Sequence, residues 1–324
     1  MMERRRYSGR SMSEPVDTRV MPMGEEAISE AARLVLAGEP VAVPTETVYG
    51  LAADATNAAA VARIYAAKGR PSFNPLIVHV PDLAAAERIG RFDGLASDLA
   101  RRHWPGPLTL VVPLREGSGI ATLVTAGLAT IGLRVPAHPA MLALLKACGR
   151  PLAAPSANAS GLISPTRASH VMASLAGRIP LVIDGGATQR GIESTIVAAT
   201  DGSLRLLRRG PIEIGAAELD RPKRIEAPGQ LASHYAPRKP LRLDATDTEG
   251  DEYLIGFGAV AGNATLSKSG DPVEAAAQLF DLLHQADAAP QSRIAVAPIP
   301  GDGIAAAIRD RLKRAAVPRP DSTI

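Results

Sequence analysis

The sequence VAVPTETVYGL, residues 41–51, places a short apolar run directly before a loop that is dense in hydroxyl side chains. The run itself, Val41–Val43, predicts a buried strand that ends at Pro44. Before it, apolar residues spaced three or four apart predict a helix over residues 25–37, with Gly38 where the cap at its C-terminal end is expected. A helix that leads into a buried strand is typical of an α/β domain.

Similar apolar runs recur through the first two thirds of the chain and predict further strands. They lie at residues 76–80, 108–112, 130–135, 152–154, 181–184, 195–198 and 204–207. Helical patterns between some of them lie at residues 57–69, 93–103, 139–148 and 166–176. Because there are more strands than a regular alternation would give, we expect a twisted mixed sheet covered by helices.

A change in the sequence pattern after residue 215 predicts a second, smaller domain. Prolines interrupt any periodic pattern between residues 216 and 240, which indicates an extended linker; they are Pro222, Pro228, Pro237 and Pro240. Beyond it, strand patterns lie at 241–243, 253–256 and 294–297, and helical patterns at 272–285 and 303–316. We expect a disordered basic tail over 1–22, a large α/β domain over 23–215, the linker over 216–240 and a small α/β domain over 241–324.

The composition of the 324 residues, 46% apolar and 21% charged, is typical of a soluble globular protein. The single Cys148 excludes an internal disulfide, and no stretch approaches the roughly 20 apolar residues of a membrane span, so we expect a cytoplasmic protein. The tail over residues 1–22 holds +2 of the formal net charge of +3. The nearly neutral remainder argues against strong general binding of nucleic acid.

The usual nucleotide and metal motifs are missing. The chain contains neither Gly-Lys-Ser nor Gly-Lys-Thr, so no Walker-type phosphate loop is expected. Gly256, Gly258 and Gly262 do not match a dinucleotide fingerprint and are interpreted as a strand-to-turn transition. The six histidines show no ligand spacing, so we expect no metal held by protein side chains.

Several polar residues at the ends of elements remain as candidates. Lys68 and Arg70, at a helix end, could meet a triphosphate, or they could simply complement the helix macrodipole. Ser156 and Asn158 follow a strand and could direct a hydroxyl and an amide into one crevice, or could form only a turn. His79 lies alone in a strand, where a histidine is more often a satisfied structural residue than a ligand contact.

The order of the segments and the residues in them resemble those of the YrdC-like family of threonylcarbamoyl-AMP synthases. The resemblance is carried by PTETVYGLAADA (44–55), KGRP (68–71), NPLIVHV (74–80), WPGPLTLVV (104–112), TIGLRVPAHP (130–139), APSANASGLISPT (154–166), DGG (184–186) and GIESTIV (191–197). HYAP (234–237) and the helical segment 303–316 resemble the longer, two-domain members. The resemblance implies a YrdC-like twisted mixed sheet followed by a small Rossmann-like domain.

The resemblance also implies a reaction. L-threonine, bicarbonate or CO2, and ATP would give L-threonylcarbamoyl-AMP and pyrophosphate, with Mg²⁺ accompanying ATP, which makes the protein a nucleotidyltransferase. A partner complex would then transfer the threonylcarbamoyl group to adenosine in tRNA, and weak RNA binding would be compatible with that role. Two rivals are a non-catalytic RNA-binding module and a carbamoyl-transfer enzyme of hydrogenase maturation, whose zinc motifs the single cysteine excludes.

Carried over by motif, two groups of residues are implied to bind the substrates. Those around L-threonine are Thr47, His79, Arg134, Ser156 and Ser194. Those around ATP are Lys68, Arg70, Asn74, Thr130, Asn158, Thr166, Arg208 and Tyr235, with Lys68 and Arg70 as the catalytic cations. The family usually reads Arg-Pro-Gly where this chain has Arg208-Arg209-Gly210, so either Arg208 or Arg209 is the nucleotide contact.

Overall fold

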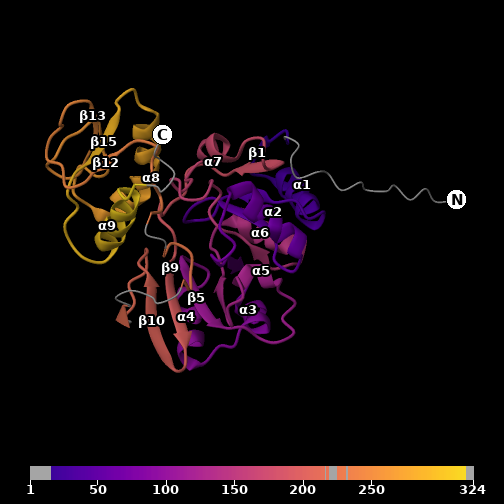
Figure 1. The fold of residues 1–324 in the computed structure, drawn as a ribbon. Coiled ribbons are helices and arrows are strands. Elements are labelled where there is room, and N and C mark those ends of the chain that lie inside the picture. Colours follow the sequence, from indigo (N-terminus) through magenta and orange to yellow (C-terminus); the bar gives the residue numbers. More distant parts are fainter. Residues whose placement is uncertain (1–15, 216, 219–224, 231–232, 319–324) are drawn as a thin grey trace.

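The structure is a computed structural model that describes residues 16–215, 217–218, 225–230 and 233–318. It contains a large mixed sheet covered by helices and, beside it, a smaller parallel sheet at the C-terminal end of the chain (Figure 1). Both the fold class predicted from the sequence and the presence of a second α/β unit are confirmed.

The large sheet has the strand order β1-β8-β2-β3-β7-β4-β6-β5-β9-β10-β11. In chain order its strands are β1 (Arg19–Pro22), β2 (Val41–Val43), β3 (Gly50–Asp54), β4 (Ile77–His79), β5 (Leu108–Pro113), β6 (Thr130–Arg134), β7 (Leu152–Ala153), β8 (Leu181–Asp184), β9 (Thr195–Thr200), β10 (Ser203–Arg208) and β11 (Ala217–Glu218). It contains parallel pairs such as β4–β6 and antiparallel pairs such as β2–β3 and β4–β7. The sheet is therefore mixed.

Helices cover both faces of this sheet. They are α1 (Glu25–Leu36), α2 (Ala58–Lys68), α3 (Leu83–Ile89), α4 (Gly94–His103), α5 (Thr122–Thr125), α6 (Pro139–Cys148) and α7 (Ala168–Leu175). Helices α1 and α6 pack with Val41 and Val43 on one face, whereas Ala42 belongs to the larger core with α2, α3, α4, α5 and α7. The alternation of side chains along β2 thus supplies both cores.

Helix α2 shows how the sequence positions a functional residue. The Asn57 side chain accepts hydrogen bonds from the backbone N–H groups of Ala59 and Ala60, which fixes the start of the helix. Gly69 ends it with a φ of +59°, a left-handed conformation that a glycine adopts without steric penalty. The predicted cap and stop are both confirmed, and they bring Lys68 and Arg70 to one helix end.

The C-terminal unit is a four-stranded parallel sheet in the order β12-β15-β13-β14. Its elements are β12 (Leu241–Arg242), β13 (Glu252–Gly256), β14 (Ala264–Thr265), α8 (Pro272–Ala288), β15 (Arg293–Val296) and α9 (Ile304–Ala315). After β13, the backbone N–H of Phe257 donates to the carbonyl of Val260 at 3.0 Å. The glycines around this bond therefore serve a turn, as predicted.

The two units share a hydrophobic core. Val48, Ile163 and Ile192 of the large domain pack with Tyr235 of the linker against buried residues of α8 and α9. The approach is close: a Cβ atom at Gly191 would lie 2.2 Å from the carbonyl oxygen of Ala276. The C-terminal domain is thus packed onto the large domain.

Two expectations about local structure need correction. Residues 19–22 are not part of a disordered tail, because β1 pairs in parallel with β8, with Arg19 opposite Leu181. The strand is mostly exposed and, with four residues, too short to show a periodic pattern, and residues 1–15 lie outside the described part. The loop expected after Pro44 becomes strand β3 at Gly50, paired antiparallel with β2. Its small residues lack the β-branched signal of a strand.

Candidate active site

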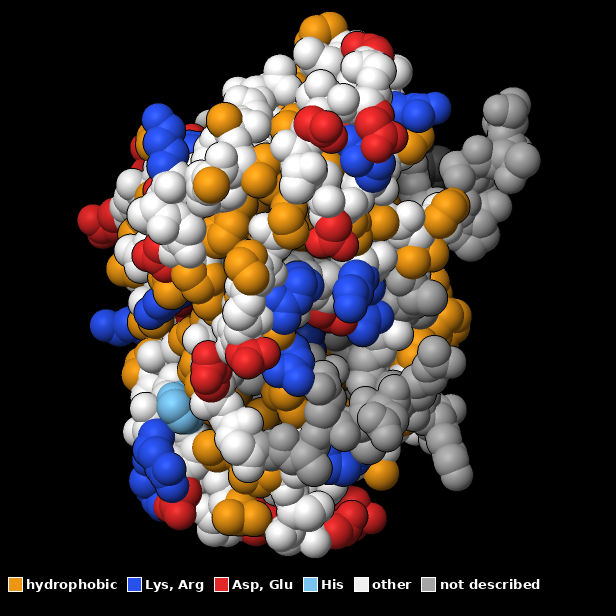
Figure 2. Space-filling model, turned by 90° about the vertical axis from the view of Figure 1, so that its left-hand side faces the viewer, with side chains coloured by type: hydrophobic (Ala, Val, Ile, Leu, Met, Phe, Trp, Pro, Cys, Tyr) orange, Lys and Arg blue, Asp and Glu red, His pale blue; other side chains and the backbone are white. Residues whose placement is uncertain are grey.

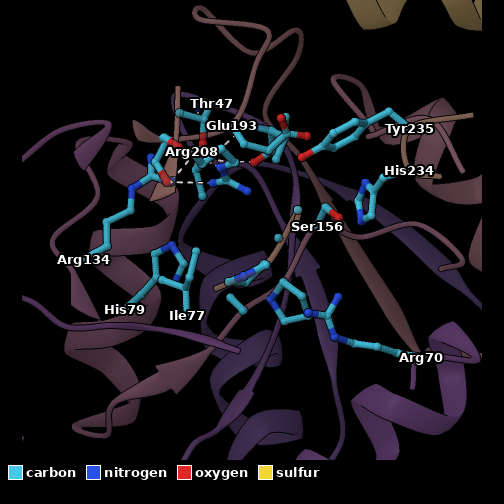
Figure 3. Close-up of a pocket in the computed structure, with 18 residues that line it drawn as sticks. Thr47, Arg70, Ile77, His79, Arg134, Ser156, Glu193, Arg208, His234 and Tyr235 are labelled. Carbon is cyan, nitrogen blue, oxygen red and sulfur yellow. Dashed lines mark hydrogen bonds between the residues drawn. The ribbon is translucent and has the colours of Figure 1, made fainter. Parts of the chain in front are cut away.

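A pocket of about 540 Å³ lies where several strands of the large sheet end, beneath the linker. The side chains that line it come from segments far apart in the sequence, and among them are Thr47, Arg70, His79, Arg134, Ser156, Ser194, Arg208 and Tyr235. Figure 3 shows Arg134 and His79 on one side of the pocket, with His234 and Tyr235 on the other. All five residues predicted to surround threonine therefore line one pocket.

Arg134, at the end of β6, is held in place by a buried network. Its Nη1 donates to the Thr47 hydroxyl at 3.0 Å, its Nε donates to the Gly106 carbonyl at 3.2 Å, and its Nη2 lies 2.6 Å from the Glu46 carboxylate. Burial by itself would raise the pKa of Glu46, but the charge of Arg134 and the hydrogen bonds from Arg134 and the backbone together outweigh it, so the pKa lies below its ordinary value. The arginine is thus a fixed cation at the edge of the pocket.

His79 lies beside this cation. Among the described residues, neither of its ring nitrogens has a hydrogen-bond partner, although the side chain is buried. Burial, followed by the charge of Arg134, lowers the pKa of His79 well below its usual value, so the imidazole is neutral at physiological pH. Because buried polar groups are normally hydrogen-bonded, an unpartnered imidazole at a pocket wall is suited to contact a ligand.

Ser194 and Arg208 form a third side of the pocket. The Ser194 hydroxyl lies 2.8 Å from the Thr109 hydroxyl, and Arg208 donates to the hydroxyl and the carbonyl of Ser194, both at 3.0 Å. Arg209 instead lines a different cavity, beside Gly210. Of the two arginines between which the sequence left the choice open, Arg208 lines the pocket, and its contact with a nucleotide stays a prediction.

The two predicted catalytic cations are placed differently: Arg70 lies in the pocket wall, whereas Lys68 contacts the Ser156–Asn158 loop. Arg70 lines the pocket, and its guanidinium donates to the carbonyls of Asn74 and Pro75 at 3.2 and 2.9 Å. Burial lowers its pKa to about 10, which leaves it charged at neutral pH. The Lys68 ammonium donates to the carbonyl of Ser156 at 2.5 Å and to that of Asn158.

Lys68 is not among the residues that line the pocket. Burial, together with the charge of Arg70, lowers its pKa well below the ordinary value. Its contacts with the Ser156 and Asn158 carbonyls tie the end of α2 to the loop after β7. A direct catalytic role of Lys68 stays a prediction, whereas a role in placing that loop follows from its contacts.

The other residues predicted for ATP lie around the pocket rather than in its wall. The Asn158 amide donates to the carbonyls of Ala159 and Leu162. The buried Asn74 amide and the Asn158 oxygen have no hydrogen-bond partner within the part of the chain that the structure describes. Thr130 lines a neighbouring cavity of about 270 Å³. That cavity and the pocket share the lining residues Ile77 and Pro228.

The linker covers the pocket with two adjacent rings. Tyr235 is buried with a φ of +64°, and its ring centroid lies 5.6 Å from that of Phe280 in α8. No residue in the described part of the chain is a hydrogen-bond partner of its hydroxyl. The ring of His234 packs edge-on against it at 4.1 Å. Sequence reasoning assigned only Tyr235 from the HYAP run, although His234 lines the pocket too. It also missed Glu193, which stands in the quoted GIESTIV run.

A stacked pair of histidines joins the domains beside this site. The ring centroids of His170 in α7 and His284 in α8 lie 3.9 Å apart. The backbone N–H of Thr166 donates to His170 Nδ1 at 3.2 Å. His170 Nε2 lies 3.4 Å from the Asp281 carboxylate, and His284 Nε2 lies 3.2 Å from the Ser164 carbonyl. Thr166, predicted to bind ATP, therefore contacts this pair, and it does not line the pocket.

Acidification is expected to destabilise the protein through this pair. Burial and the neighbouring His284 lower the pKa of His170 to about 4, even though Asp281 opposes the shift and Arg167 adds to it. A pKa below the unfolded value of about 6.5 means that this contribution is complete above that pH and is lost as pH falls toward 4. The loss amounts to roughly 3 kcal/mol.

The measurement is urea unfolding of the wild type and of His170→Gln between pH 7 and pH 4. His284, which also faces Asp287 and Arg238, shifts in the same direction and adds to the fall. We expect the free energy of unfolding to decrease less steeply with acid in the variant. Equal slopes for the two proteins would exclude His170 as a source of the acid sensitivity.

Within the described residues, no cluster of three or more histidine, cysteine, aspartate or glutamate side chains is arranged to hold a metal ion. The same residues contain no helix with the length and apolarity needed to cross a membrane. The pocket is lined by arginines, hydroxyls, aromatic rings and the buried carboxylate of Glu193 at the strand ends of an α/β sheet, a set suited to an amino acid and to phosphate groups.

This sheet and pocket define a YrdC-like α/β protein. A family model described as "Telomere recombination", which covers Sua5, YciO and YrdC proteins, matches residues 33–210, and a model described as "Threonylcarbamoyl-AMP synthase, C-terminal domain" matches residues 188–317. The chain belongs to the Sua5/YciO/YrdC family, in its two-domain form.

Relatives resemble the chain over nearly its whole length. It is 40% identical to threonylcarbamoyl-AMP synthase of Bacillus subtilis, over 89% of this chain and 92% of that protein. It is 37% identical to threonylcarbamoyl-AMP synthase of Pyrococcus abyssi, over 90% of this chain and 94% of that protein. The crystal structure of Pyrococcus abyssi Sua5 complexed with L-threonine superposes with a TM-score of 0.84 at 34% identity, covering 93% of this chain and 97% of that one.

Proposed function

We propose that this protein makes L-threonylcarbamoyl-AMP from L-threonine, bicarbonate and ATP, releasing pyrophosphate, for N6-threonylcarbamoyladenosine modification of tRNA. One observation carries the proposal: the five side chains expected around threonine line a single pocket together with Arg70 and Arg208. Full-length relatives named threonylcarbamoyl-AMP synthase, and a relative solved with L-threonine, support it. In reaction class the protein is a nucleotidyltransferase.

Threonine would bind through its charged and hydroxyl groups. Arg134 is the natural partner of the carboxylate, because its guanidinium is buried and held rigidly by Glu46 and Thr47. The unpartnered ring nitrogens of His79 and the hydroxyl of Ser194 supply further polar contacts. A fixed set of donors of this kind orients the amine of the bound amino acid.

ATP would bind between the buried cations and the linker. Arg70 and Arg208 face the pocket as phosphate ligands, and Tyr235 covers it. Thr130 and the buried amides of Asn74 and Asn158 extend this region beyond the pocket wall. Mg²⁺ would arrive as part of the ATP substrate, because the donors of the pocket suit phosphate and its carboxylate, Glu193, is engaged by Arg311 and Ser164.

The chemistry joins a carbamate to a nucleotide. The threonine amine captures carbon dioxide, from bicarbonate, as a carbamate, and a carbamate oxygen attacks the α-phosphorus of ATP while the bond to pyrophosphate breaks. Arg70 and Arg208 would stabilise the negative charge that builds on the departing pyrophosphate. Burial beneath Tyr235 would keep water from the labile carbamate. No covalent nucleophile is required.

The product is a reactive mixed anhydride, so a partner must consume it promptly. We propose a threonylcarbamoyl-transferase complex that acts on tRNA, in the cytoplasm where ATP and tRNA are found. We expect RNA binding by this chain itself to be weak, because the formal net charge is only +3 and residues 1–22 carry +2 of it. On the face drawn in Figure 2, Lys and Arg side chains gather near the centre with acidic side chains beside them.

The test is a pyrophosphate-release assay with ATP and bicarbonate, with and without threonine and with serine in its place. We expect release that depends on threonine. Serine lacks a methyl group whose burial is worth about 1–3 kcal/mol, so it should be at least about tenfold poorer. Equal release without threonine would refute the proposal, and salt-sensitive RNA binding without turnover would favour the RNA-binding alternative.

A further inference from the structure

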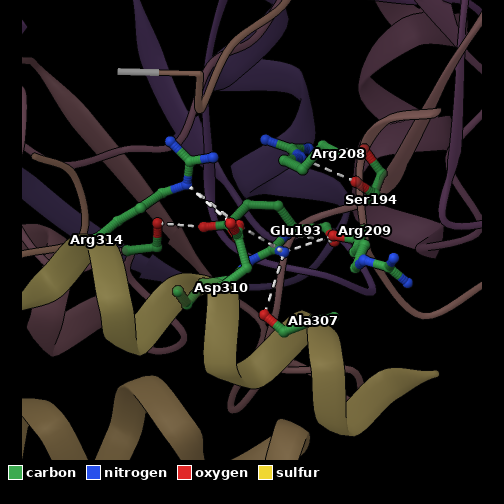
Figure 4. A network of polar contacts seen from close by, with 9 residues as sticks. Glu193, Ser194, Arg208, Arg209, Ala307, Asp310 and Arg314 are labelled. Atoms are coloured by element: carbon green, nitrogen blue, oxygen red, sulfur yellow. Dashed lines mark hydrogen bonds and ion pairs between the residues drawn. The ribbon is translucent and has the colours of Figure 1, made fainter. Parts of the chain in front are cut away.

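Arg311 of helix α9 is fully buried and reaches out of its own domain. Its Nε lies 3.1 Å from the Glu193 carboxylate, its Nη1 donates to the carbonyl of Arg209, and its Nη2 lies 3.5 Å from the Glu193 carbonyl. Within α9 the guanidinium contacts the carbonyl of Ala307 at 3.4 Å. Most of its polar contacts therefore lie in the large domain, and Figure 4 shows Glu193 between α9 and the pair Ser194 and Arg208.

The residues that Arg311 holds are chain neighbours of the pocket wall. Glu193 precedes Ser194, and Arg209 follows Arg208. Arg208 in turn donates both to the hydroxyl and to the carbonyl of Ser194. One guanidinium from the C-terminal domain thus fixes the backbone on each side of the Arg208–Ser194 contact.

Arg311 also forms an ion pair with Glu193 and so balances its negative charge. This carboxylate is buried, lines the pocket, and accepts hydrogen bonds from the Ser164 hydroxyl and from Arg311. Arg208 lines the same pocket and feels the charge of Glu193. A buried carboxylate that loses its partner is strongly unfavourable, so without Arg311 it would attract Arg208 instead.

We propose that Arg311 is a positioning residue of the active site. By pairing with Glu193 it leaves Arg208 available to an anionic ligand and holds Ser194 in place, and its guanidinium carbon lies 5.7 Å from the centre of the Tyr235 ring. The C-terminal domain thereby completes the pocket. The inference rests on the proposed function in that ATP phosphate is taken as the ligand of Arg208.

The experiment compares full-length variants in the pyrophosphate assay, in ATP-binding calorimetry and in thermal melting. Arg311→Met is expected to raise the Kd and the KM for ATP about tenfold or more, and to change the KM for threonine less. Glu193→Gln in the same chain removes the unpaired charge and should recover most of the ATP affinity. Arg311→Lys, which keeps the charge, should lie between these variants and the wild type.

Arg309→Met is the matched control, because Arg309 is on the same helix and donates to the Ile299 carbonyl inside the C-terminal domain. It should bind ATP within about twofold of the wild type. An unchanged ATP affinity in Arg311→Met, an equal loss in Arg309→Met, or a double variant that neither regains affinity nor folds would each overturn the inference. A wild type that binds ATP without threonine-dependent turnover would instead refute the proposed function.

Discussion

Replacing Arg70 by alanine is expected to lower threonine-dependent pyrophosphate release by about 1000-fold, because a buried cation that faces the phosphates would be lost. Arg70 lines the pocket, and its burial with a pKa of about 10 makes it a permanent charge in a weakly screened place. The measurement is kcat and the KM for ATP in the release assay, with the melting temperature as a check on folding.

Arg63→Ala serves as the control for this change. Arg63 belongs to the same helix, α2, but its guanidinium donates to the Gly38 carbonyl at 2.7 Å, away from the pocket. Its loss should leave turnover within about twofold of the wild type. Near-normal turnover of Arg70→Ala would remove Arg70 from the catalytic assignment.

Replacing Arg134 by methionine is expected to lower kcat/KM for threonine by about 1000-fold, since a carboxylate that loses its buried charged partner forfeits about 2–5 kcal/mol. The same change leaves Glu46 as an unpaired buried carboxylate, so stability should fall as well. Threonine binding is measured by calorimetry, and stability by thermal melting.

The double variant Arg134→Met with Glu46→Gln separates the two effects. Neutralising Glu46 should restore most of the stability, because no buried charge is then left alone. Threonine affinity should stay low, since the partner of the carboxylate is still missing. A double variant that binds threonine as tightly as the wild type would exclude Arg134 as the carboxylate ligand.

The sequence predicted those elements whose signals are local. The Asn57 cap and the Gly69 stop bound helix α2, and the apolar runs of β5, β6 and β8 locate three strands of the sheet. Strand β1 depends on pairing with β8, where Arg19 lies opposite Leu181, and its four residues are too few to carry a strand pattern of their own. The short elements α3, α5 and β14 were missed for a similar reason, since they carry little pattern of their own.

The site was predicted through its motifs and not through physics alone. Thr47, Arg134 and Ser194 are common residues whose convergence requires three strand ends to meet, and only the sheet order establishes that meeting. The choice between Arg208 and Arg209 depended on which side chain the end of β10 turns inward. For Lys68 the motif was a less complete guide. It suggested a phosphate ligand, whereas the contacts of the ammonium in the structure are to backbone carbonyls.

Val48, Ile163 and Ile192 of the large domain share a core with helices α8 and α9. Residue 240 therefore separates two sheets along the chain, but the two domains are packed together and do not have separate cores. A chimera that grafts the C-terminal domain of a relative onto this chain would have to import matching side chains at those three positions. Without them, the apolar side chains of the two domains would not fit together in the core against which Tyr235 packs. A substitution in this shared core on one domain is therefore expected to be tolerated better when its contact residue on the other domain is changed with it.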